Sequence, residues 1–443
     1  MTESLRPKGK PPDYRLRCLQ CGASYSTDPF RLYCDSDHAP ALLRTEYDSK
    51  SLAIKSHLPG IFQYIDWLPV ERWLDTHGKP ITYESKGLAH HLGLNHLYIS
   101  FNGYWPERQA QLNTGSFKEL EAATVLARIP EGHGRTLVIT SAGNTGRAFA
   151  NLCSRLKLPL MLVIPEKNLD SIWSEHLFNP GVRLIGVGND GDYSDAIALG
   201  HHISQVDDFF PEGGVFNVAR RDGMGLTVID AAVTLGHLPD HYFQAIGSGS
   251  GGIAAWEASL RLLEDGRFGS HSMKLHLAQN HPFVPVVEAW KTRSRVIPPM
   301  QESLAKSQIQ QVAASVLTNR TPAYSLAGGL YDALTGTDGE MYAVTNQETA
   351  VAQHLFETLE GIDICSASGV ATAALMQAVE SGTVQRQDSV LLNITSGGTR
   401  RIQHDYPVYR LQPQWMMPPN QLLSTTIIQE LLEPAAPTRA ALH

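Results

Sequence analysis

Short apolar runs alternate with longer segments of helical periodicity along most of the chain. The runs contain four to six residues, rich in Val, Ile and Leu, and they predict strands at residues 97–101, 136–139, 160–164, 182–187, 242–246, 274–278 and 389–394. The periodic segments predict helices at residues 120–128, 147–155 and 253–263. Strands that alternate with helices are typical of an α/β protein with parallel sheet.

The chain divides into regions of different composition. Residues 1–13 are polar and rich in Pro and Lys, so we expect them to be disordered. Residues 14–45 carry three cysteines and predict a small ribbon-like module. The α/β pattern predicts a large domain from residues 46–109 and 216–405, and a small domain from residues 110–215. Residues 406–443 form a C-terminal extension with an apolar stretch at 422–432.

Composition limits the class of protein. The 443 residues are 42% hydrophobic and 18% charged, and the net charge is −8. These values are typical of a globular protein, and the acidic balance argues against nucleic acid or an anionic membrane as a partner. No stretch approaches the roughly 20 apolar residues of a membrane span. Five cysteines do not form a disulfide framework, and the N-terminal residues lack the apolar core of a signal peptide, so we expect a cytoplasmic protein.

Lys118 follows the turn Asn113-Thr-Gly-Ser-Phe and begins a predicted helix. A cation is disfavoured at a helix N-terminus, because the backbone dipole is already positive there. The position therefore suits a neutral amine or an imine, the state needed for a Schiff base with pyridoxal phosphate (PLP). A surface lysine in the first helical turn is the alternative.

The second motif, Thr140-Ser-Ala-Gly-Asn-Thr-Gly146, lies between a predicted strand and a predicted helix. This geometry aims backbone N–H groups at an anion. Asn144 is a candidate for a ring hydroxyl of the cofactor, while the turn would hold a substrate carboxylate. The alternative is an ordinary strand-to-helix turn.

The third motif, Gly247-Ser-Gly-Ser-Gly-Gly252, also lies between strand and helix. Its glycines allow the backbone to wrap a phosphate at a helix N-terminus. The candidate phosphate ligands are Gly247, Ser248, Gly249, Ser250 and Gly251. The motif also matches the dinucleotide fingerprint, but that function needs an acidic residue about 20 positions on, and the next predicted strand ends in Gln279-Asn280. A phosphate loop is therefore favoured over an NAD site.

The fourth motif, Asn393-Ile-Thr-Ser-Gly-Gly-Thr399, follows the last predicted strand. The hydroxyl of Thr395 or Ser396 could hydrogen-bond the pyridine nitrogen of PLP. A hydroxyl does not force that nitrogen to be protonated, which suits β-elimination and β-replacement. A polar turn is the alternative.

In this order the four motifs resemble those of the fold type II (tryptophan synthase β-like) PLP enzymes, which include threonine synthase and cysteine synthase. Within them the chain resembles the cysteate synthase family, and the stretches that carry this likeness are residues 58–70, 98–107, 114–121 and 360–364. The resemblance implies two doubly wound parallel-sheet domains plus a small N-terminal ribbon, with the cofactor between the two domains.

The resemblance implies β-replacement on O-phosphoserine with sulfite as the nucleophile, and a homo-oligomer, expected to be a dimer. The substrates would be small molecules: a phosphorylated amino acid and an oxyanion. The implied substrate-binding residues are Thr114, Ser116, Ser141, Ala142, Gly143, Thr145, Arg147, Asn217 and Arg220. Arg147 is the first candidate for the oxyanion, because such groups need a fixed cation.

Other functions remain open at this point. A threonine synthase would act on O-phosphohomoserine and water, and another β-replacement enzyme would use a different nucleophile. A non-catalytic subunit of the same fold is a further alternative, which the presence of Lys118 disfavours.

The cysteine-bearing module has ligands with metal-like spacing. Cys18 and Cys21 form a C-x-x-C pair, and Cys34 and His38 follow. This set resembles a small zinc ribbon with three thiolates and one imidazole. A degenerate ribbon that folds without metal is the alternative.

Overall fold

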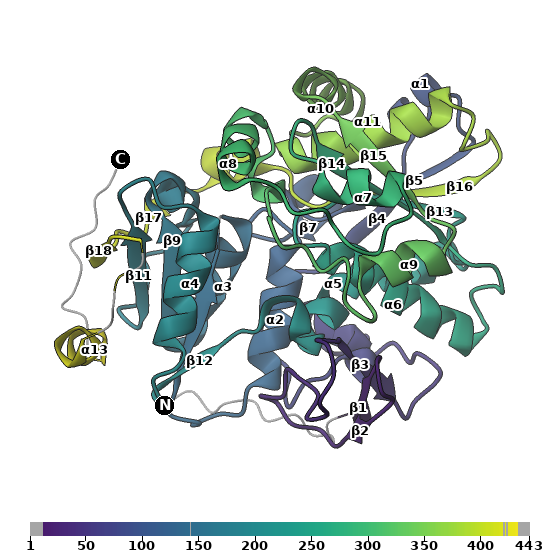
Figure 1. Cartoon of the computed structure of the whole chain (residues 1–443). Coiled ribbons are helices and arrows are strands. Elements are labelled where there is room, and N and C mark those ends of the chain that lie inside the picture. The colour runs from purple at the N-terminus through teal and green to yellow at the C-terminus, as the bar shows by residue number, and fades with distance from the viewer. Residues whose placement is uncertain (1–11, 142, 420, 422–423, 433–443) are drawn as a thin grey trace. The chain divides into compact units, whose positions relative to one another are not determined.

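A computed structural model describes residues 12–141, 143–419, 421 and 424–432 (Figure 1). The chain divides into two compact units. The first unit holds residues up to 129 and residues 214–399, and the second holds residues 130–213 and the chain from 400 onward. Almost all of the segment 1–13, which we expected to be disordered, lies outside the described residues.

The main sheet of the first unit has six strands in the order β15-β14-β13-β16-β5-β4. All neighbours are parallel except β4, which is antiparallel to β5. The strands are β15 (Glu340–Val344), β14 (Lys274–Asn280), β13 (His241–Ala245), β16 (Ser389–Ile394), β5 (His96–Phe101) and β4 (Ile81–Glu84). The α/β prediction with parallel sheet is confirmed.

Helices cover both faces of this sheet (Figure 1). On one face α1 (Gly87–Leu92), α10 (Asn346–Glu360) and α11 (Ser366–Glu380) bury their apolar residues in one core with the strands. On the other face lie α5 (Val218–Leu235) and α6 (Ser250–Asp265), and α2 (Lys118–Arg128) packs on α5. The remaining elements of this unit are η1 (Gly60–Trp67), β6 (Tyr104–Trp105), η2 (Pro106–Arg108), β7 (Ala110–Gln111), η4 (Gly214–Phe216), α7 (Pro285–Lys291), α8 (Glu302–Gln311), η5 (Ser315–Leu317) and α9 (Leu330–Gly336).

The predicted ribbon is an antiparallel sheet within the first unit, in the order β2-β1-β3. Its strands are β1 (Tyr14–Cys18), β2 (Ser24–Tyr25) and β3 (Leu43–Tyr47). Two side chains of β3 anchor it to α5, because Thr45 and Tyr47 both donate to the buried carboxylate of Asp222, at 2.7 and 2.6 Å.

The second unit has a parallel sheet of five strands in the order β12-β8-β9-β11-β18. They are β12 (Phe209–Pro211), β8 (Thr136–Thr140), β9 (Leu160–Pro165), β11 (Val182–Val187) and β18 (Trp415–Met417). The unit also contains α3 (Asn144–Leu156), η3 (Glu166–Ser171), α4 (Tyr193–Ile203), α13 (Thr425–Leu432) and the antiparallel pair β10 (Trp173–Ser174) and β17 (Tyr409–Arg410). The chain enters this unit for the second time at residue 400, within α12 (Thr399–Asp405).

The unit boundaries differ from the expected domains. Residues 110–129 belong to the first unit, because α2 packs along α5. The C-terminal segment is part of the second unit: β18 extends its sheet, and Leu431 of α13 is buried in its core beside Val138 and Met161. These contacts explain the apolar stretch that the motifs left without a role.

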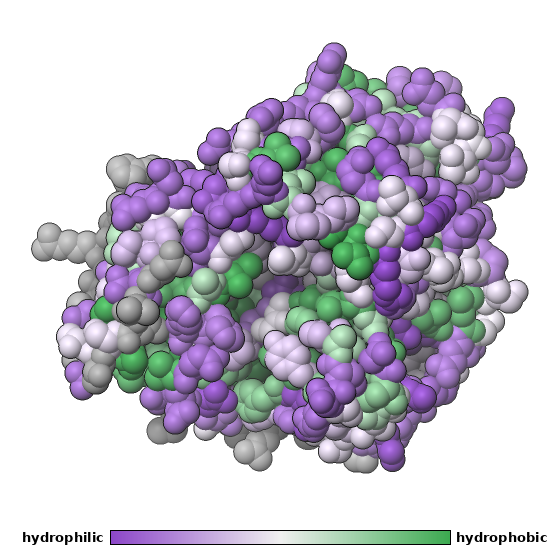
Figure 2. Space-filling view, in the orientation of Figure 1, coloured by the Kyte–Doolittle hydropathy of each residue, from purple (hydrophilic) through white to green (hydrophobic). Residues whose placement is uncertain are grey.

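The surface of the described chain is largely polar on the face that Figure 2 shows, and apolar residues there form smaller separate groups. None of the described helices combines the length and the apolar character needed to cross a membrane.

Candidate active site

Three of the four sequence motifs meet in the first unit. The glycine-rich loop follows β13 and the hydroxyl motif follows β16, and these two strands are neighbours in the sheet. The turn before Lys118 is bonded to the hydroxyl motif through the backbone, since Phe117 N donates to Thr395 O at 2.9 Å and Gly397 N donates to Gly115 O at 3.2 Å. Ligands of α/β proteins bind at the carboxyl ends of parallel strands, which is where these loops gather.

Two positions of the glycine-rich loop, 249 and 251, have no room for a side chain. Gly249 precedes α6 with a φ of +87°, and a Cβ there would lie 2.4 Å from a methyl carbon of Leu330. A Cβ on Gly251 would lie 2.2 Å from the side-chain nitrogen of Gln244. The protein therefore fills one side of this loop. The N–H groups in the first turn of α6 have no intrahelical partners, and Ser250 N makes only a long bond of 3.4 Å to Ser248 Oγ, so this turn can bind an anion.

The two serines of this loop hold it together. The hydroxyl oxygens of Ser248 and Ser250 are 3.0 Å apart, and Ala323 N donates to Ser248 O at 2.9 Å. Gly247 approaches Leu317, where an added Cβ would lie 3.1 Å from the Cα atom.

Lys118 is the first residue of α2. Its amine donates to Glu121 Oε2 at 2.9 Å and lies 4.8 Å from the centre of the Phe117 ring. The sequence argument against a cation at this helix start overlooked Glu121, whose carboxylate stabilises an ammonium group there. The i, i+3 spacing on a predicted helix is the signal that could have found it.

Hydroxyl groups near Lys118 have different environments. Ser396 Oγ donates to Gly115 O at 2.6 Å, so it already joins the two loops. Thr395 Oγ1 makes no hydrogen bond with any residue that the structure describes. Ser116 Oγ is buried without a hydrogen-bond partner among those residues. Thr114 instead donates its hydroxyl to Glu119 Oε2 at 3.1 Å, a contact that sequence reasoning missed.

The remaining motif, residues 140–146 with Asn144, belongs to the second unit. Ser141 Oγ accepts hydrogen bonds from Gly143 N and Gly146 N, at 3.0 and 2.9 Å, and shapes the turn before α3. Ala142 lies outside the described residues. Thr145 follows Asn144 in the first turn of α3, where helical N–H groups lack intrahelical partners.

Arg147 is buried within the second unit rather than displayed on its surface. Its Nη2 donates to Asn144 Oδ1 at 2.8 Å and its Nη1 to Ser171 O at 3.3 Å. Its guanidinium carbon lies 4.5 Å from the centre of the Trp173 ring. These contacts fix the orientation of the Asn144 amide.

Asn217 and Arg220, two of the expected substrate-binding residues, lie at the start of α5 in the first unit. Asn217 caps the helix by accepting from Ala219 N at 3.0 Å, and it also accepts from Arg128 Nη1 at 3.1 Å. Arg220 Nη1 lies 3.2 Å from Glu121 Oε1, so this arginine reaches the carboxylate that binds Lys118. Arg221, the next residue along the chain, is fully buried and pairs with Glu257 at 2.9 Å.

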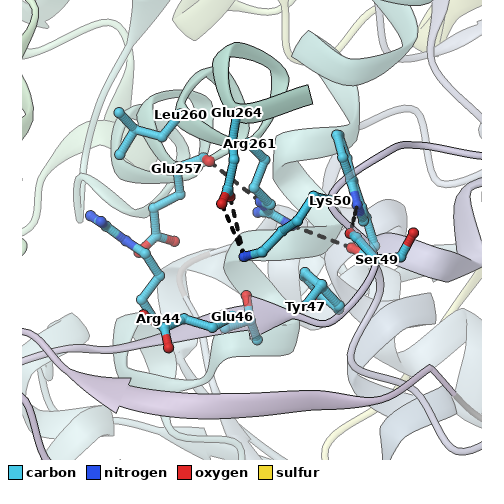
Figure 3. A pocket seen from close by; sticks show the side chains of 11 residues that line it. Arg44, Glu46, Tyr47, Ser49, Lys50, Glu257, Leu260, Arg261 and Glu264 are labelled. Atoms are coloured by element: carbon cyan, nitrogen blue, oxygen red, sulfur yellow. Dashed lines mark hydrogen bonds and ion pairs between the residues drawn. The ribbon is translucent and has the colours of Figure 1, made fainter. Parts of the chain in front are cut away.

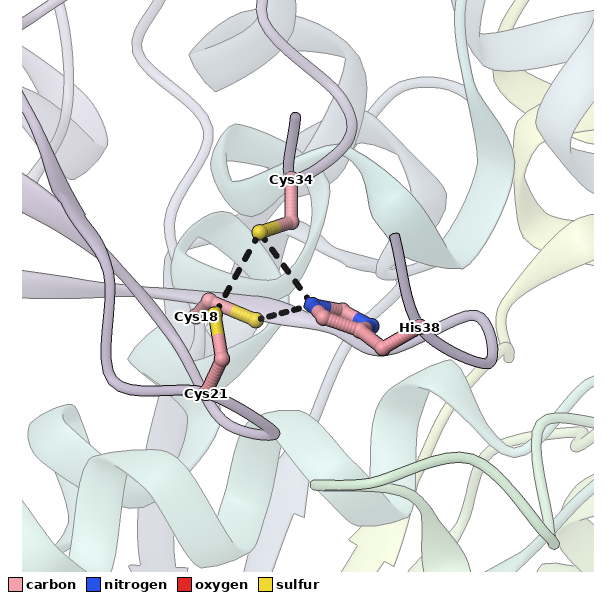
Figure 4. Close-up of side chains that lie close together, drawn as sticks. All are labelled: Cys18, Cys21, Cys34 and His38. Carbon is pink, nitrogen blue, oxygen red and sulfur yellow. Dashed lines mark hydrogen bonds between the residues drawn. The ribbon is translucent and has the colours of Figure 1, made fainter. Parts of the chain in front are cut away.

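The four predicted metal ligands form one cluster (Figure 4). The ligand atoms of Cys18, Cys21, Cys34 and His38 all lie within 4.8 Å of one another. His38 Nε2 is 3.4 Å from Cys18 Sγ and 3.2 Å from Cys34 Sγ, and the sulfurs of Cys21 and Cys34 are 3.6 Å apart. Zinc bonds of about 2.3 Å to sulfur and about 2.0 Å to nitrogen in a tetrahedron need separations of this size.

The surroundings of the cluster also suit a metal. The hydrogen bond from the Tyr25 hydroxyl, 3.0 Å long, lowers the pKa of the Cys34 thiol to about 5, and the thiolate is the form that binds metal. His38 Nδ1 lies 2.7 Å from Ala39 O, and the pKa of His38 rises to about 9, because the imidazolium bonds this carbonyl and Cys34. In a metal site the same carbonyl would keep the proton on Nδ1 and leave Nε2 for the metal.

A small cavity of about 200 Å³ lies between β3 and α6, away from the gathered loops (Figure 3). Charged side chains that line it are paired, as Lys50 with Glu264 at 3.1 Å and Arg44 with Glu257 at 3.2 Å. We assign it no function.

Comparisons with known proteins agree with this geometry. The family model for pyridoxal-phosphate dependent enzymes matches residues 76–396. Cysteate synthase from Methanosarcina mazei is 50% identical over 402 residues, which are 90% of this chain and 96% of that protein. The Methanosarcina barkeri cysteate synthase is 48% identical with the same coverage. Maize serine racemase, at 12% identity, superposes with a TM-score of 0.53 over 72% of this chain and 89% of that one, and it supports the fold alone.

The chain therefore belongs to the pyridoxal-phosphate dependent enzymes of fold type II. Its curated relatives place it more narrowly in the cysteate synthase family.

The residues of the first unit fit this cofactor. Side chains at Gly249 and Gly251 would clash with Leu330 and Gln244, so the backbone of this loop stays bare for a phosphate, and the buried Ser116 hydroxyl, which has no hydrogen-bond partner among the described residues, lies in the lysine turn. PLP needs an amine, a phosphate site and a partner for its ring nitrogen. Lys118, the loop at α6 and the hydroxyl motif have these chemistries.

Proposed function

We propose that this enzyme is a cysteate synthase, which converts O-phospho-L-serine and sulfite into L-cysteate and phosphate. The observation that carries the proposal is the identity of about half of all residues to cysteate synthases over 90% of the chain. The reaction breaks the bond between the β-carbon and the phosphate oxygen, and it forms a bond between that carbon and sulfur. PLP supplies the electron sink that makes the α-proton acidic.

In the first unit we assign three roles. Lys118 holds the cofactor, and its amine takes the α-proton and later returns a proton. The N–H groups around Gly249 and Ser250 hold the cofactor phosphate. We assign the hydroxyl of Thr395, and not that of Ser396, to the ring nitrogen, because the Ser396 hydroxyl already donates to Gly115 O.

In the second unit we assign the turn of residues 141–145 to the substrate carboxylate and Asn144 to the ring hydroxyl of the cofactor. The bond from Arg147 holds Asn144 Oδ1, so the amide N–H₂ group is the end that remains for a ligand. Arg147 was our first candidate for binding the oxyanion. Its contact with Asn144 adds a second role, and Arg147→Ala should change the absorbance of the bound cofactor as well as raise KM.

We assign Arg220 to the phosphate of the substrate or to sulfite. The support is that Arg220 and Lys118 both contact the carboxylate of Glu121. Thr114 and Asn217 act on the site through the turn and the helix cap that they stabilise. Ser116 is the hydroxyl that is left for a bound molecule.

We further propose that Cys18, Cys21, Cys34 and His38 bind one structural zinc ion. The support is that the four ligand atoms lie within 4.8 Å of one another, with three of the separations between 3.2 and 3.6 Å. The ion would fix the loop that contains Asp28, whose carbonyl accepts from Arg128 Nη2 at 2.7 Å.

Two further parts of the proposal are a homodimer, which the family resemblance supports, and a cytoplasmic location, which the cysteine content and the polar N-terminal residues support. All five cysteines are among the described residues and none forms a disulfide, which agrees with a reducing compartment. Light scattering on the purified chain would test the dimer.

Product formation tests the reaction. The enzyme should make cysteate from O-phosphoserine plus sulfite, and no threonine from O-phosphohomoserine. Threonine without cysteate would favour a threonine synthase, and neither product would favour a different nucleophile. Lys118→Ala should abolish turnover and the trapping of PLP by borohydride. A reducible adduct in that variant would show that Lys118 is not the cofactor lysine.

A further inference from the structure

Three different cation-binding groups surround the amine of Lys118. Glu121 Oε2 lies 2.9 Å from Nζ, the centre of the Phe117 ring 4.8 Å, and Met224 Sδ 3.7 Å. A carboxylate, an aromatic face and a polarisable sulfur together are suited to a primary ammonium ion. All three belong to the first unit, so its own packing builds the arrangement.

Glu121 is the centre of this arrangement. Its side chain is fully buried, on the same face of α2 as Lys118 because the two are three residues apart. An isolated buried carboxylate is strongly disfavoured, so it must be compensated by nearby cations. Two cations share it, since Lys118 is bonded to one oxygen and Arg220 lies 3.2 Å from the other.

Close packing of α2 and α5 supplies the second cation. A Cβ on Gly223 would lie 2.6 Å from both the Leu120 carbonyl and the Thr124 hydroxyl, so only glycine allows this approach. Arg220 is one helical turn before Gly223 on α5, and it therefore lies at the same contact. The carboxylate keeps one compensating charge even when the lysine amine moves away.

We propose that Glu121, Phe117 and Met224 form an ammonium site that holds Lys118 whenever its amine is not bonded to the cofactor. Glu121 is then a positioning residue, because it acts through Lys118. Arg220 balances its charge while the lysine is engaged. The site returns the amine to one place, next to the α2 N-terminus, after each proton transfer. This inference rests on the proposed role of Lys118.

The site should bind a free ammonium ion once the lysine side chain is removed. Full-length Lys118→Ala protein is titrated with methylammonium chloride, and thermal unfolding is followed. A ligand that binds only the folded state raises Tm with its concentration, and we expect a rise of about 2–6 °C that grows with the logarithm of the methylammonium concentration. Sodium chloride at equal ionic strength is the reference, and tetramethylammonium, which has no N–H donor, should have a smaller effect. The cofactor-free parent protein should not respond, because its Lys118 amine then occupies the site.

A matched pair of carboxylate variants locates the effect. Adding Glu121→Gln to Lys118→Ala should abolish the methylammonium response. Adding Glu257→Gln instead should preserve it, because Glu257 is also a buried carboxylate between two arginines but belongs to the cluster of Arg44 and Arg221. If the Glu121 double variant does not fold, Phe117→Leu in the Lys118→Ala background replaces it. We expect this change to weaken methylammonium binding about 2- to 30-fold through loss of the cation–π contact.

The outcomes separate this inference from the function it rests on. If Lys118→Ala still forms a borohydride-reducible adduct with PLP, the role of Lys118 is wrong. If the adduct is lost but methylammonium raises Tm no more than sodium does, the ammonium site is wrong and the function stands. An equal methylammonium response in the Glu121 and Glu257 double variants would also overturn the site, as would an unchanged affinity in Phe117→Leu.

Discussion

Gly249 offers a sharp test of the phosphate loop, because the same helix provides its control. Gly249 caps the N-terminus of α6 at φ +87°, and Gly266 caps the C-terminus at φ +77°. A Cβ on Gly249 would lie 2.4 and 2.8 Å from two carbons of Leu330, whereas a Cβ on Gly266 meets nothing within 4 Å. Alanine at either position carries the same backbone penalty, and only one of them also clashes.

The magnitudes follow from these two effects. A non-glycine residue at positive φ costs about 1–2 kcal/mol, and overpacking a filled site costs about 1–3 kcal/mol more. Gly266→Ala should therefore lower the free energy of unfolding by about 1–2 kcal/mol and leave PLP affinity unchanged. Gly249→Ala should lower it by about 2–5 kcal/mol and displace the loop. If about 1.5–3 kcal/mol of this cost falls on the loop conformation that binds PLP, the Kd for PLP rises roughly ten- to hundredfold.

The assay is a titration of the cofactor-free enzyme with PLP, followed by absorbance, with urea unfolding measured in parallel. Leu330→Ala combined with Gly249→Ala removes the clashing side chain and should restore much of the affinity. Equal PLP affinities for the Gly249 and Gly266 variants would refute a phosphate site at this loop. A double variant no better than Gly249→Ala would show that the clash is not the cause.

Three further predictions follow from the site and its surroundings. Thr395→Ala should lower kcat/KM about tenfold or more and leave the unfolding free energy nearly unchanged. Ser396→Ala should cost about 0.5–1.5 kcal/mol of stability, because Gly115 O loses one of its two donors and keeps only the bond from Gly397 N. The reverse pattern would exchange their roles. Purified protein should contain about one zinc per chain by elemental analysis, and Cys34→Ser should lower both the zinc content and the Tm. If the parent protein has the same Tm with and without metal, the ribbon folds without metal. Burial, with the nearby charges of His241 and Lys274, lowers the pKa of His276 to about 2. Below about pH 6.5 the unfolded chain therefore binds one proton more than the folded chain does at this residue. The free energy of unfolding then falls as the pH falls, by up to about 1.4 kcal/mol per pH unit. His276→Gln should flatten unfolding free energy against pH between pH 6 and 4, and an unchanged slope would assign the acid sensitivity to other groups.

Local pattern was enough to predict the main strands. The predicted runs at 182–187 and 389–394 coincide with β11 and β16, and the other predicted strands differ from the structure by one or two residues at an end. These strands are buried on both faces of a parallel sheet, so they read as continuous apolar runs. β15 was not predicted, because it lies at the edge of its sheet, most of its residues are only partly buried, and its sequence begins with Glu340.

The sequence by itself also singled out Lys118, the glycine loop and the four candidate metal ligands, because each set consists of residues that are close along the chain. The tertiary structure alone decided which of two adjacent hydroxyls is already bonded, and that Arg220 and Lys118 share one carboxylate. It also decided that the C-terminal segment completes a sheet beside β11, more than 200 residues earlier in the chain. Such contacts join residues that are distant in sequence, and their geometry follows from how helices and strands pack, which no local pattern records.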